Sequence, residues 1–197
     1  MSSTSAARSR KSPKRDLLLE TAFRLFYLSG YHAVGIDTIL AEAGVAKMTL
    51  YNHFKSKDEL IVAALQRRAD EILSAREATL SAASDDPLDQ LSALFDAYEG
   101  WFKTPDFNGC AFIRAIAEYP DQASPVNQAV RQQKQILIDQ LESLARKLPT
   151  DDPKSLATQI YLLAEGAIIR AHTFRDPAAA QLAKEGALAL AKAARRP

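Results

Sequence analysis

Proline placement constrains the fold of this chain more than any other feature of its sequence. A serine or aspartate at a helix N-cap accepts a hydrogen bond from a free N–H of the first turn. A proline in the next position loses only an N–H that has no partner in the helix. Five of the nine prolines stand in such pairs, each of which predicts a helix start: Ser12-Pro13, Asp86-Pro87, Ser124-Pro125, Asp152-Pro153 and Asp176-Pro177.

The segments between these pairs have the periodicity of amphipathic helices. A sixth start is indicated by Ser56-Lys57-Asp58-Glu59, which has the pattern of a capping box. The sequence shows no sustained alternation of period two and no Asn-Gly or Asp-Gly pair typical of a hairpin. We therefore predict an all-α fold with about nine helices. Apolar residues at helical spacing are Leu88, Leu91, Phe95, Tyr98 and Phe102 after Pro87, and Val126, Val130, Leu137, Leu141, Leu144 and Leu148 after Pro125.

Composition excludes several classes of protein. The chain of 197 residues is 47% hydrophobic and 25% charged, which is typical of a globular protein and too apolar for a disordered one. A single cysteine, Cys110, excludes an intramolecular disulfide and a metal site with paired thiolates. No apolar stretch reaches the length of a membrane span, and no hydrophobic segment of a secretory signal follows the basic N-terminus. We expect a protein of the reducing cytoplasm.

Positive charge is concentrated at the N-terminal end. Residues 1–57 hold nine Lys/Arg against four Asp/Glu, whereas residues 58–197 hold sixteen against twenty. This asymmetry indicates that the first third of the chain meets a polyanion, or else that it carries a solvated charged tail. Residues 1–12 are expected to form a disordered basic arm. Its Arg8, Arg10 and Lys11 either enter a minor groove, as flexible arms do, or remain free in solvent, and we favour a diffuse electrostatic attraction.

The region after the arm has the pattern of a helix-turn-helix. A first helix is predicted from Pro13 to Ser29, ended by Gly30, and a short helix follows up to Ala43. The link Gly44-Val45-Ala46 then leads into a second short helix, predicted from Lys47 to Phe54. Two helices of about two turns, joined by three or four residues that include a glycine, are typical of this DNA-binding motif.

This region resembles the TetR family of bacterial transcriptional regulators. The resemblance spans about residues 13–61 and departs from the family pattern at Val34-Gly35 and at Ala46, where hydroxyl side chains are usual. It implies a helix-turn-helix DNA-binding domain over residues 13–57 and a larger helical effector-binding and dimerisation domain over residues 58–197. The residues that carry it are Ala22, Phe26, Gly30-Tyr31, Ile36, Ile39, Ala43-Gly44-Val45 and the run KMTLYNHFKSKDEL from Lys47 to Leu60.

The second short helix has side chains suited to reading DNA. In a major groove, Lys47 can donate to guanine, Asn52 can pair with adenine, and Met48 and Thr49 can contact a thymine methyl group. Tyr51, His53, Lys55 and Lys57 are suited to phosphate contacts, whereas Leu50 and Phe54 are expected in the core. Asn52 as an ordinary surface residue and His53 as a structural histidine remain alternatives.

An aromatic cluster in the larger domain is a candidate effector pocket. Aromatic walls with one cation and one carboxylate suit a small molecule, although the same residues can be ordinary core. Cys110 is a candidate redox or electrophile sensor, or a small core residue. The candidate pocket residues are Tyr98, Trp101, Phe102, Phe107, Cys110, Phe112, Arg114 and Glu118.

The last two helices, predicted at about residues 153–173 and 177–194, are candidates for a homodimer interface. The alternative is that they complete a monomeric core. The interface stripe is expected to contain Leu156, Ile160, Leu163, Ala167, Arg170 and Ala171, with small residues on the last helix that allow close approach, namely Ala180, Ala183, Gly186, Ala187 and Ala191. A two-fold axis would place two recognition helices about 34 Å apart on a pseudo-palindromic DNA site.

These observations predict a homodimeric, ligand-responsive regulator, most simply a repressor that a small-molecule effector releases from a double-stranded DNA operator. It would be associated with the nucleoid when bound. The alternatives are a helical small-molecule-binding protein or enzyme without DNA specificity, and a nonspecific architectural DNA binder. The sequence shows no Gly-rich phosphate loop, no grouping of its three histidines and no catalytic triad pattern. We therefore expect no enzyme activity, no cofactor, no metal site and no membrane contact.

Overall fold

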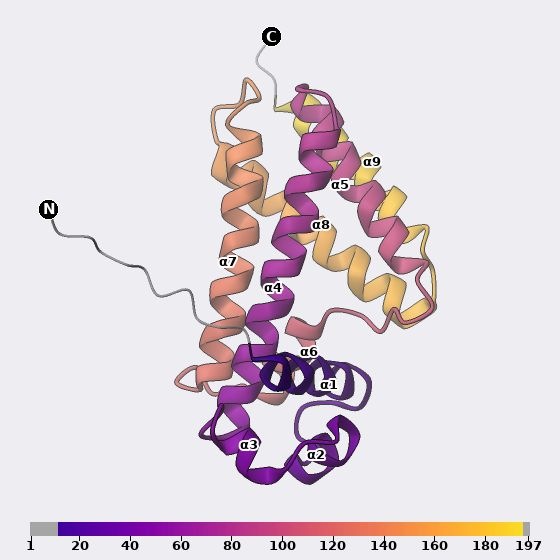
Figure 1. The fold of residues 1–197 in the computed structure, drawn as a ribbon. Helices are drawn as coiled ribbons and strands as arrows, with labels where there is room; N and C mark the ends of the chain where they lie inside the picture. The colour runs from indigo at the N-terminus through magenta and orange to yellow at the C-terminus, as the bar shows by residue number, and fades with distance from the viewer. Residues whose placement is uncertain (1–11, 195–197) are drawn as a thin grey trace, which may run out of the picture. The chain divides into compact units, whose positions relative to one another are not determined.

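The computed structural model describes residues 12–194, and all regular structure within them is helical (Figure 1). The predicted all-α fold is confirmed. The predicted arm at residues 1–12 lies, except for Ser12, outside the described residues. The helices are α1 (Pro13–Ser29), α2 (Ile36–Ala43), α3 (Lys47–Tyr51), α4 (Lys57–Ala82), α5 (Pro87–Phe102), α6 (Ala111–Glu118), α7 (Pro125–Ala145), α8 (Pro153–Phe174) and α9 (Ala179–Ala193).

The helix starts show why the Ser-Pro and Asp-Pro pairs were informative. Asp86, Ser124 and Asp152 each accept a hydrogen bond from a backbone N–H of the first turn of α5, α7 and α8, at 2.7, 3.2 and 2.9 Å. Ser12 occupies the N-cap of α1 without a capping hydrogen bond, and its Oγ lies 3.4 Å from Nε2 of His53 instead.

The last helix begins later than predicted. The sequence placed its start at Pro177, but α9 begins at Ala179. The N–H groups of Ala179 and Ala180 bond to carbonyl groups three residues back, at 3.2 and 3.3 Å, so the chain first makes a tight turn. Asp176 caps this turn by accepting from the N–H of Ala178 at 3.1 Å.

The chain divides into two compact units, residues 1–64 and 65–197. In the first unit, α1, α2 and α3 pack around a small apolar core in which Phe26 stacks on Tyr31 with ring centroids 5.2 Å apart. Leu50 and Phe54 are both buried, as expected for the inward face of the segment from Lys47 to Phe54. The other fully buried side chains of this core include Leu18, Ala22 and Ile39.

In the second unit, α8 packs against α7 and α9, and α5 packs against α9 (Figure 1). The small side chains of α9 face inward and permit these close contacts, since Ala180, Ala187 and Ala191 are fully buried. The core also takes up Phe95 and Phe102 from α5.

Four of the six residues of the stripe predicted as a dimer interface are part of this core, which corrects their sequence-based assignment; Leu163 is half-buried against the core and Arg170 is exposed. Leu156, Ile160, Ala167 and Ala171 are buried within the chain itself. Periodicity identified an apolar face on α8 correctly. It could not indicate whether that face meets α7 and α9 of the same chain or a second chain.

Candidate functional site

The turn between α2 and α3 is built on Gly44. Its backbone is left-handed, with φ 61° and ψ 34°, which glycine adopts without steric cost. The N–H of Gly44 bonds to the carbonyl of Ala41 at 3.3 Å, and that of Val45 bonds to the carbonyl of Leu40 at 3.1 Å. These bonds close α2 and turn the chain into α3, the second helix of the predicted helix-turn-helix.

Helix α3 is shorter than the sequence predicted. It ends at Tyr51, whereas the sequence placed its end at Phe54. The N–H of His53 bonds to the carbonyl of Leu50, three residues back, at 2.9 Å, so the helix tightens into a turn that carries Phe54 into the core. Ala46 provides no side-chain cap at the other end, as its lack of a hydroxyl implies.

The residues predicted to read DNA bases are on the outside of this segment. Met48 is 72% exposed, which is unusual for a large apolar side chain. Lys47 and Asn52 are exposed, and Thr49 is half-buried. Lys47 Nζ lies 3.5 Å from Oδ1 of Asp37, an exposed pair that a phosphate or base can displace at little cost.

The residues predicted to bind phosphate divide into two groups. Tyr51 and Lys55 are exposed, whereas His53 and Lys57 are half-buried. His53 has Ser12 Oγ beside its ring, and Lys57 Nζ donates to the carbonyl of His32 at 3.2 Å. These two side chains therefore also tie parts of the small unit together.

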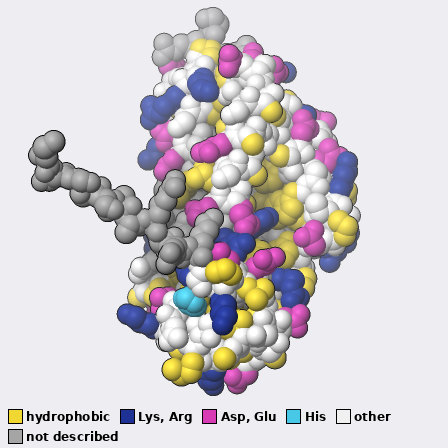
Figure 2. Space-filling model, in the orientation of Figure 1, with side chains coloured by type: hydrophobic (Ala, Val, Ile, Leu, Met, Phe, Trp, Pro, Cys, Tyr) yellow, Lys and Arg dark blue, Asp and Glu magenta, His cyan; other side chains and the backbone are white. Residues whose placement is uncertain are grey.

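The start of α4 forms a capping arrangement next to this surface. Ser56 Oγ accepts from the N–H of Glu59 at 3.1 Å, as the capping box requires. The Glu59 carboxylate accepts from the N–H of Lys55 at 2.7 Å, one residue before the position that the box predicts. Figure 2 shows Lys, Arg, hydrophobic and acidic side chains interspersed over the surface where Figure 1 places α2 and α3.

The aromatic residues predicted to line an effector pocket form a connected cluster in the second unit. Trp101 contacts Phe107 edge to face, with ring centroids 5.0 Å apart, and Phe102 lies 5.0 Å from Phe107. Tyr98 joins the cluster at 6.4 Å from Trp101. Phe102 and Phe107 are buried core, whereas Tyr98 and Trp101 are only half-buried.

The remaining predicted pocket residues belong to α6. Cys110 is its N-cap, Phe112 is buried, and Arg114 and Glu118 are half-buried. Cys110 Sγ lies 3.6 Å from Nζ of Lys134 on α7.

Lys134 itself forms an ion pair with Glu165 on α8, with N–O distances of 2.7 and 2.8 Å and side chains only 18% and 15% exposed. Burial lowers the pKa of Lys134, but the nearby Cys110 and Glu165 groups outweigh it, so the net pKa is raised above the ordinary 10.5.

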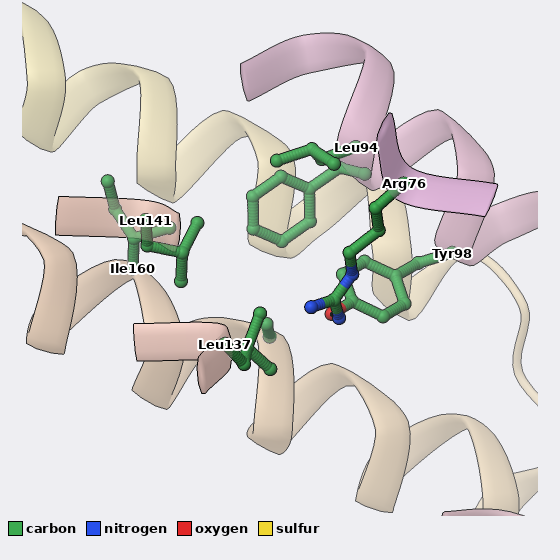
Figure 3. Close-up of a pocket in the computed structure, with 8 residues that line it drawn as sticks. Arg76, Leu94, Tyr98, Leu137, Leu141 and Ile160 are labelled. Atoms are coloured by element: carbon green, nitrogen blue, oxygen red, sulfur yellow. The ribbon is translucent and has the colours of Figure 1, made fainter. Parts of the chain in front are cut away.

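A small pocket lies between α4, α5, α7 and α8 (Figure 3). Of the predicted effector residues, only Tyr98 lines it. The space between atoms, including the open mouth, amounts to about 250 Å³, and the part that fits the centre of a water molecule is only about 10 Å³. The lining residues are Arg76, Leu94, Phe95, Tyr98, Leu137, Leu141, Ile160 and Ala164.

Arg76 and Tyr98 form the polar end of this pocket. The Arg76 guanidinium donates to Tyr98 Oη at 2.6 Å, and more weakly to Gln140 Oε1 at 3.5 Å. Its central carbon lies 5.8 Å from the centre of the Tyr98 ring. Burial raises the pKa of Tyr98 above its ordinary 10.0, against the effect of Arg76, so the phenol stays protonated.

Sequence reasoning missed Arg76, Lys134 and Glu165, although a signal was present. Arg76 occupies a position of the apolar stripe of α4, between Ile72 and Leu80. Lys134 similarly interrupts the apolar spacing of α7, four residues after Val130. A charged residue at a core position of an amphipathic helix is a candidate for a buried pair or a ligand contact.

Two further classes of site are not found between residues 12 and 194. None of the helices there combines the length and apolarity that a membrane crossing requires. His, Cys, Asp and Glu side chains in the same part of the chain nowhere gather into a group that suits a metal ion.

Comparison with known proteins identifies both halves of the chain. The family model described as bacterial regulatory proteins of the tetR family matches residues 18–64. A second model, the tetracyclin repressor-like C-terminal domain, matches residues 87–187. The crystal structure of SCO4454, a TetR-family transcriptional regulator from Streptomyces coelicolor, is 34% identical and has a TM-score of 0.87. That comparison covers 93% of this chain and 96% of SCO4454.

Two curated relatives are transcriptional regulators of the same type. The HTH-type transcriptional regulator YjdC of Escherichia coli is 26% identical over 157 residues, 80% of this chain and 82% of YjdC. The HTH-type transcriptional activator FasR of Mycolicibacterium smegmatis is 43% identical over 75 residues, which cover 38% of this chain and 34% of FasR. Both family models and a full-length structural relative agree. The chain belongs to the TetR family of bacterial helix-turn-helix transcriptional regulators, which bind DNA and are not enzymes.

Proposed function

We propose that this protein is a homodimeric repressor that binds a pseudo-palindromic operator through α3 and leaves it when a small molecule binds the second unit. The observation that carries this proposal is the exposed surface of α3 beside a glycine-built turn. A dimer over promoter DNA excludes polymerase without any further contact, which favours repression over activation. Such a regulator acts in the cytoplasm, on the nucleoid when bound.

Base reading is assigned to Lys47, Met48, Thr49 and Asn52. The exposed N-terminal part of α3 suits a major groove, since the first side chains of a recognition helix reach base edges. Lys47 is directed to guanine O6 or N7 and Asn52 to adenine N6 and N7, while Met48 supplies an apolar contact for a thymine methyl group. Because Thr49 is half-buried, its methyl group extends less far towards the bases than the Met48 side chain does.

Phosphate contacts are assigned to Tyr51, His53, Lys55 and Lys57. These contacts fix the position of the protein on the duplex without reading sequence. Each neutralised phosphate releases counterions, so operator affinity is expected to fall steeply as salt rises.

The test is selection of bound sequences from random DNA, followed by titration of the selected site at several salt concentrations. Lys47→Ala and Asn52→Ala are expected to change which bases are preferred, whereas Lys57→Ala weakens all sites by a similar factor. Because Lys57 also donates to the His32 carbonyl, the thermal stability of the Lys57→Ala variant is measured in parallel. Lys154→Ala, an exposed lysine of the second unit, is the matched control and is expected to bind as wild type.

Two results would contradict the assignment of the DNA-binding face. One is unchanged affinity and base preference in all three variants. The other is an affinity that does not change with salt, because a protein that neutralises no phosphates cannot be holding a duplex in this way.

The dimer interface is assigned to the outward face of α8 and α9. Leu162 and Ile169 are 63% and 55% exposed, and their spacing of seven residues places them on one face of α8. Leu182 on α9 is 58% exposed. Large exposed apolar side chains on two helices that pack against each other favour an interaction surface there.

Leu162→Glu combined with Ile169→Glu is expected to convert the dimer into a monomer in light scattering coupled to size exclusion. Leu17→Glu, an exposed leucine of α1, is the control and leaves the mass unchanged. A wild-type protein that is monomeric at micromolar concentration, or a double variant that stays dimeric, would contradict this interface.

Release by an effector is assigned to a shift of α4, which carries Arg76 in its second half and continues from the capped start at Ser56. A ligand that binds one state of the dimer better than the other changes operator affinity by the ratio of its two affinities. A reporter gene behind the selected operator tests the direction. Expression that rises when the gene of this protein is deleted supports repression, and expression that falls contradicts it.

A further inference from the structure

The pocket of Figure 3 has one charged end and an otherwise apolar wall. Leu141 and Ile160 lie away from the Arg76 guanidinium, which lies over the Tyr98 ring and donates to its hydroxyl group (Figure 3). Leu94, Phe95, Leu137 and Ala164 complete the apolar part. A ligand that fills this pocket must therefore be apolar over most of its surface and polar at one end.

The charge at the polar end is positive and uncompensated by any carboxylate. Among the residues that the structure describes, the Arg76 guanidinium forms no ion pair with an Asp or Glu; it donates to the neutral Tyr98 hydroxyl and the neutral Gln140 amide. Besides Arg76, the charged side chains of Glu165 and Lys134 act on the pKa of Tyr98, in opposite directions. They are paired with each other at 2.7 Å, so their charges cancel.

The donors at this end match a planar anion. A guanidinium presents parallel N–H groups that bind both oxygens of a carboxylate. Tyr98 Oη accepts a hydrogen bond from Arg76. Because the hydroxyl group stays protonated, its O–H can donate a hydrogen bond to an anionic oxygen of the ligand. The site offers two adjacent hydrogen-bond donors and no negatively charged group. It therefore disfavours an amine and favours a carboxylate over a neutral amide.

The size of the pocket limits the apolar part of the ligand. The enclosed part of the pocket, about 10 Å³, is far smaller than the sites of about 300–1,000 Å³ that hold drug-sized ligands. Only about 10 Å³ fits the centre of a water molecule in the present conformation, so a ligand must move the walls apart. A single ring or a short alkyl chain requires the smallest movement.

We infer that the effector of this regulator is a small apolar monocarboxylate, with its carboxylate on Arg76 and Tyr98 and its apolar body among Leu137, Leu141 and Ile160. This inference rests on the proposed function, because it names the ligand class of the effector site. Arg76, which would hold the ligand charge, stands on α4.

Binding can be measured without DNA, because the only tryptophan, Trp101, lies beside Tyr98 with ring centroids 6.4 Å apart. Its fluorescence is titrated at neutral pH with phenylacetate and hexanoate, and with phenylacetamide as the neutral analogue of the first. The acids are expected to bind about tenfold or more tightly than the amide, since a charge-assisted contact is the strongest that this pocket offers.

Arg76→Gln is expected to remove this preference for the acids, whereas Arg76→Lys keeps part of it because the charge remains. Tyr98→Phe is expected to weaken the acids more than the amide. Arg67→Gln, a change of the same type on the same helix at an arginine paired with Glu71, is the control and binds as wild type. Circular dichroism of each variant excludes unfolding as the cause.

The inference is overturned if neither acid binds the wild type, or if acid and amide bind equally. It is also overturned if Arg76→Gln keeps the preference for acids while remaining folded. The proposed function fails separately, when the random-DNA selection enriches no operator. If the acids bind but no operator is enriched, the assignment of the ligand class holds and the proposed function as a DNA-binding repressor fails.

Discussion

The buried pair of Lys134 and Glu165 gives the sharpest prediction about stability. Each side chain is less than a fifth exposed, and both Glu165 oxygens accept from Lys134 Nζ within 2.8 Å. Removing one partner of a buried pair leaves the other charge uncompensated and costs about 3–5 kcal/mol. Because both side chains retain some contact with water, we expect about 2–4 kcal/mol for Glu165→Leu and for Lys134→Met.

The double variant is expected to be far more stable than the sum of the single effects implies. Replacing both charges with apolar side chains of similar size removes the desolvation penalty together with the attraction, so the net change is about 0–1 kcal/mol. The coupling energy of the cycle is then about 3 kcal/mol or more. The matched control is Arg24–Glu42, which has the same distance of 2.7 Å but side chains about half exposed, and its cycle is expected to give less than about 1 kcal/mol.

The measurement is urea unfolding followed by Trp101 fluorescence, at fixed protomer concentration because dimer dissociation contributes to the midpoint. The raised pKa of Lys134 fixes the pH range. The stabilisation from charged Lys134 is complete below its pKa of 10.5 in the unfolded state and is lost only as pH rises through its higher pKa in the folded state. The coupling energy is therefore expected to be constant between about pH 6 and 9. Additive single effects of less than about 1 kcal/mol would refute the reasoning.

Three further changes probe other parts of the molecule. Gly109→Ala is expected to lower the free energy of unfolding by about 1–3 kcal/mol, because φ is 78° there and the new Cβ would lie 3.0 Å from Cγ of His172; an unchanged urea midpoint would contradict this. Burial, and then Arg175, lower the pKa of His172, so the unfolded state binds more protons as pH falls through 6.5 and stability declines on acidification. His172→Gln should therefore show a smaller difference between melting curves at about pH 7.5 and 5.5 than wild type does. Phe54→Ala removes a buried ring of the DNA-binding unit and should cost about 3–5 kcal/mol, with DNA binding lost at temperatures where circular dichroism shows the unit unfolded.

Local chemistry explains why most helix boundaries could be predicted. The cap at Asp86 depends on residues two positions apart, and the left-handed turn at Gly44 depends on the absence of one side chain. The corrections at Tyr51 and Ala179 concern one turn at a helix end, where bonds to the third residue back compete with bonds to the fourth. The run from Lys47 to Leu60 indicated the family because it carries core and DNA-facing positions in one short segment.

Capping, periodicity and motif spacing act over a few residues, so the all-α fold, the helix-turn-helix and the side chains available on α3 could be predicted from the sequence. Which apolar faces are internal and which groups meet depends on the folded chain as a whole. Arg76 and Tyr98, 22 residues apart, form one end of a pocket whose other walls come from α7 and α8, and Lys134 meets Glu165 across 31 residues. Periodicity shows that a helix has an apolar face or a charge within it, but the partner of that face or charge is set by how the whole chain packs.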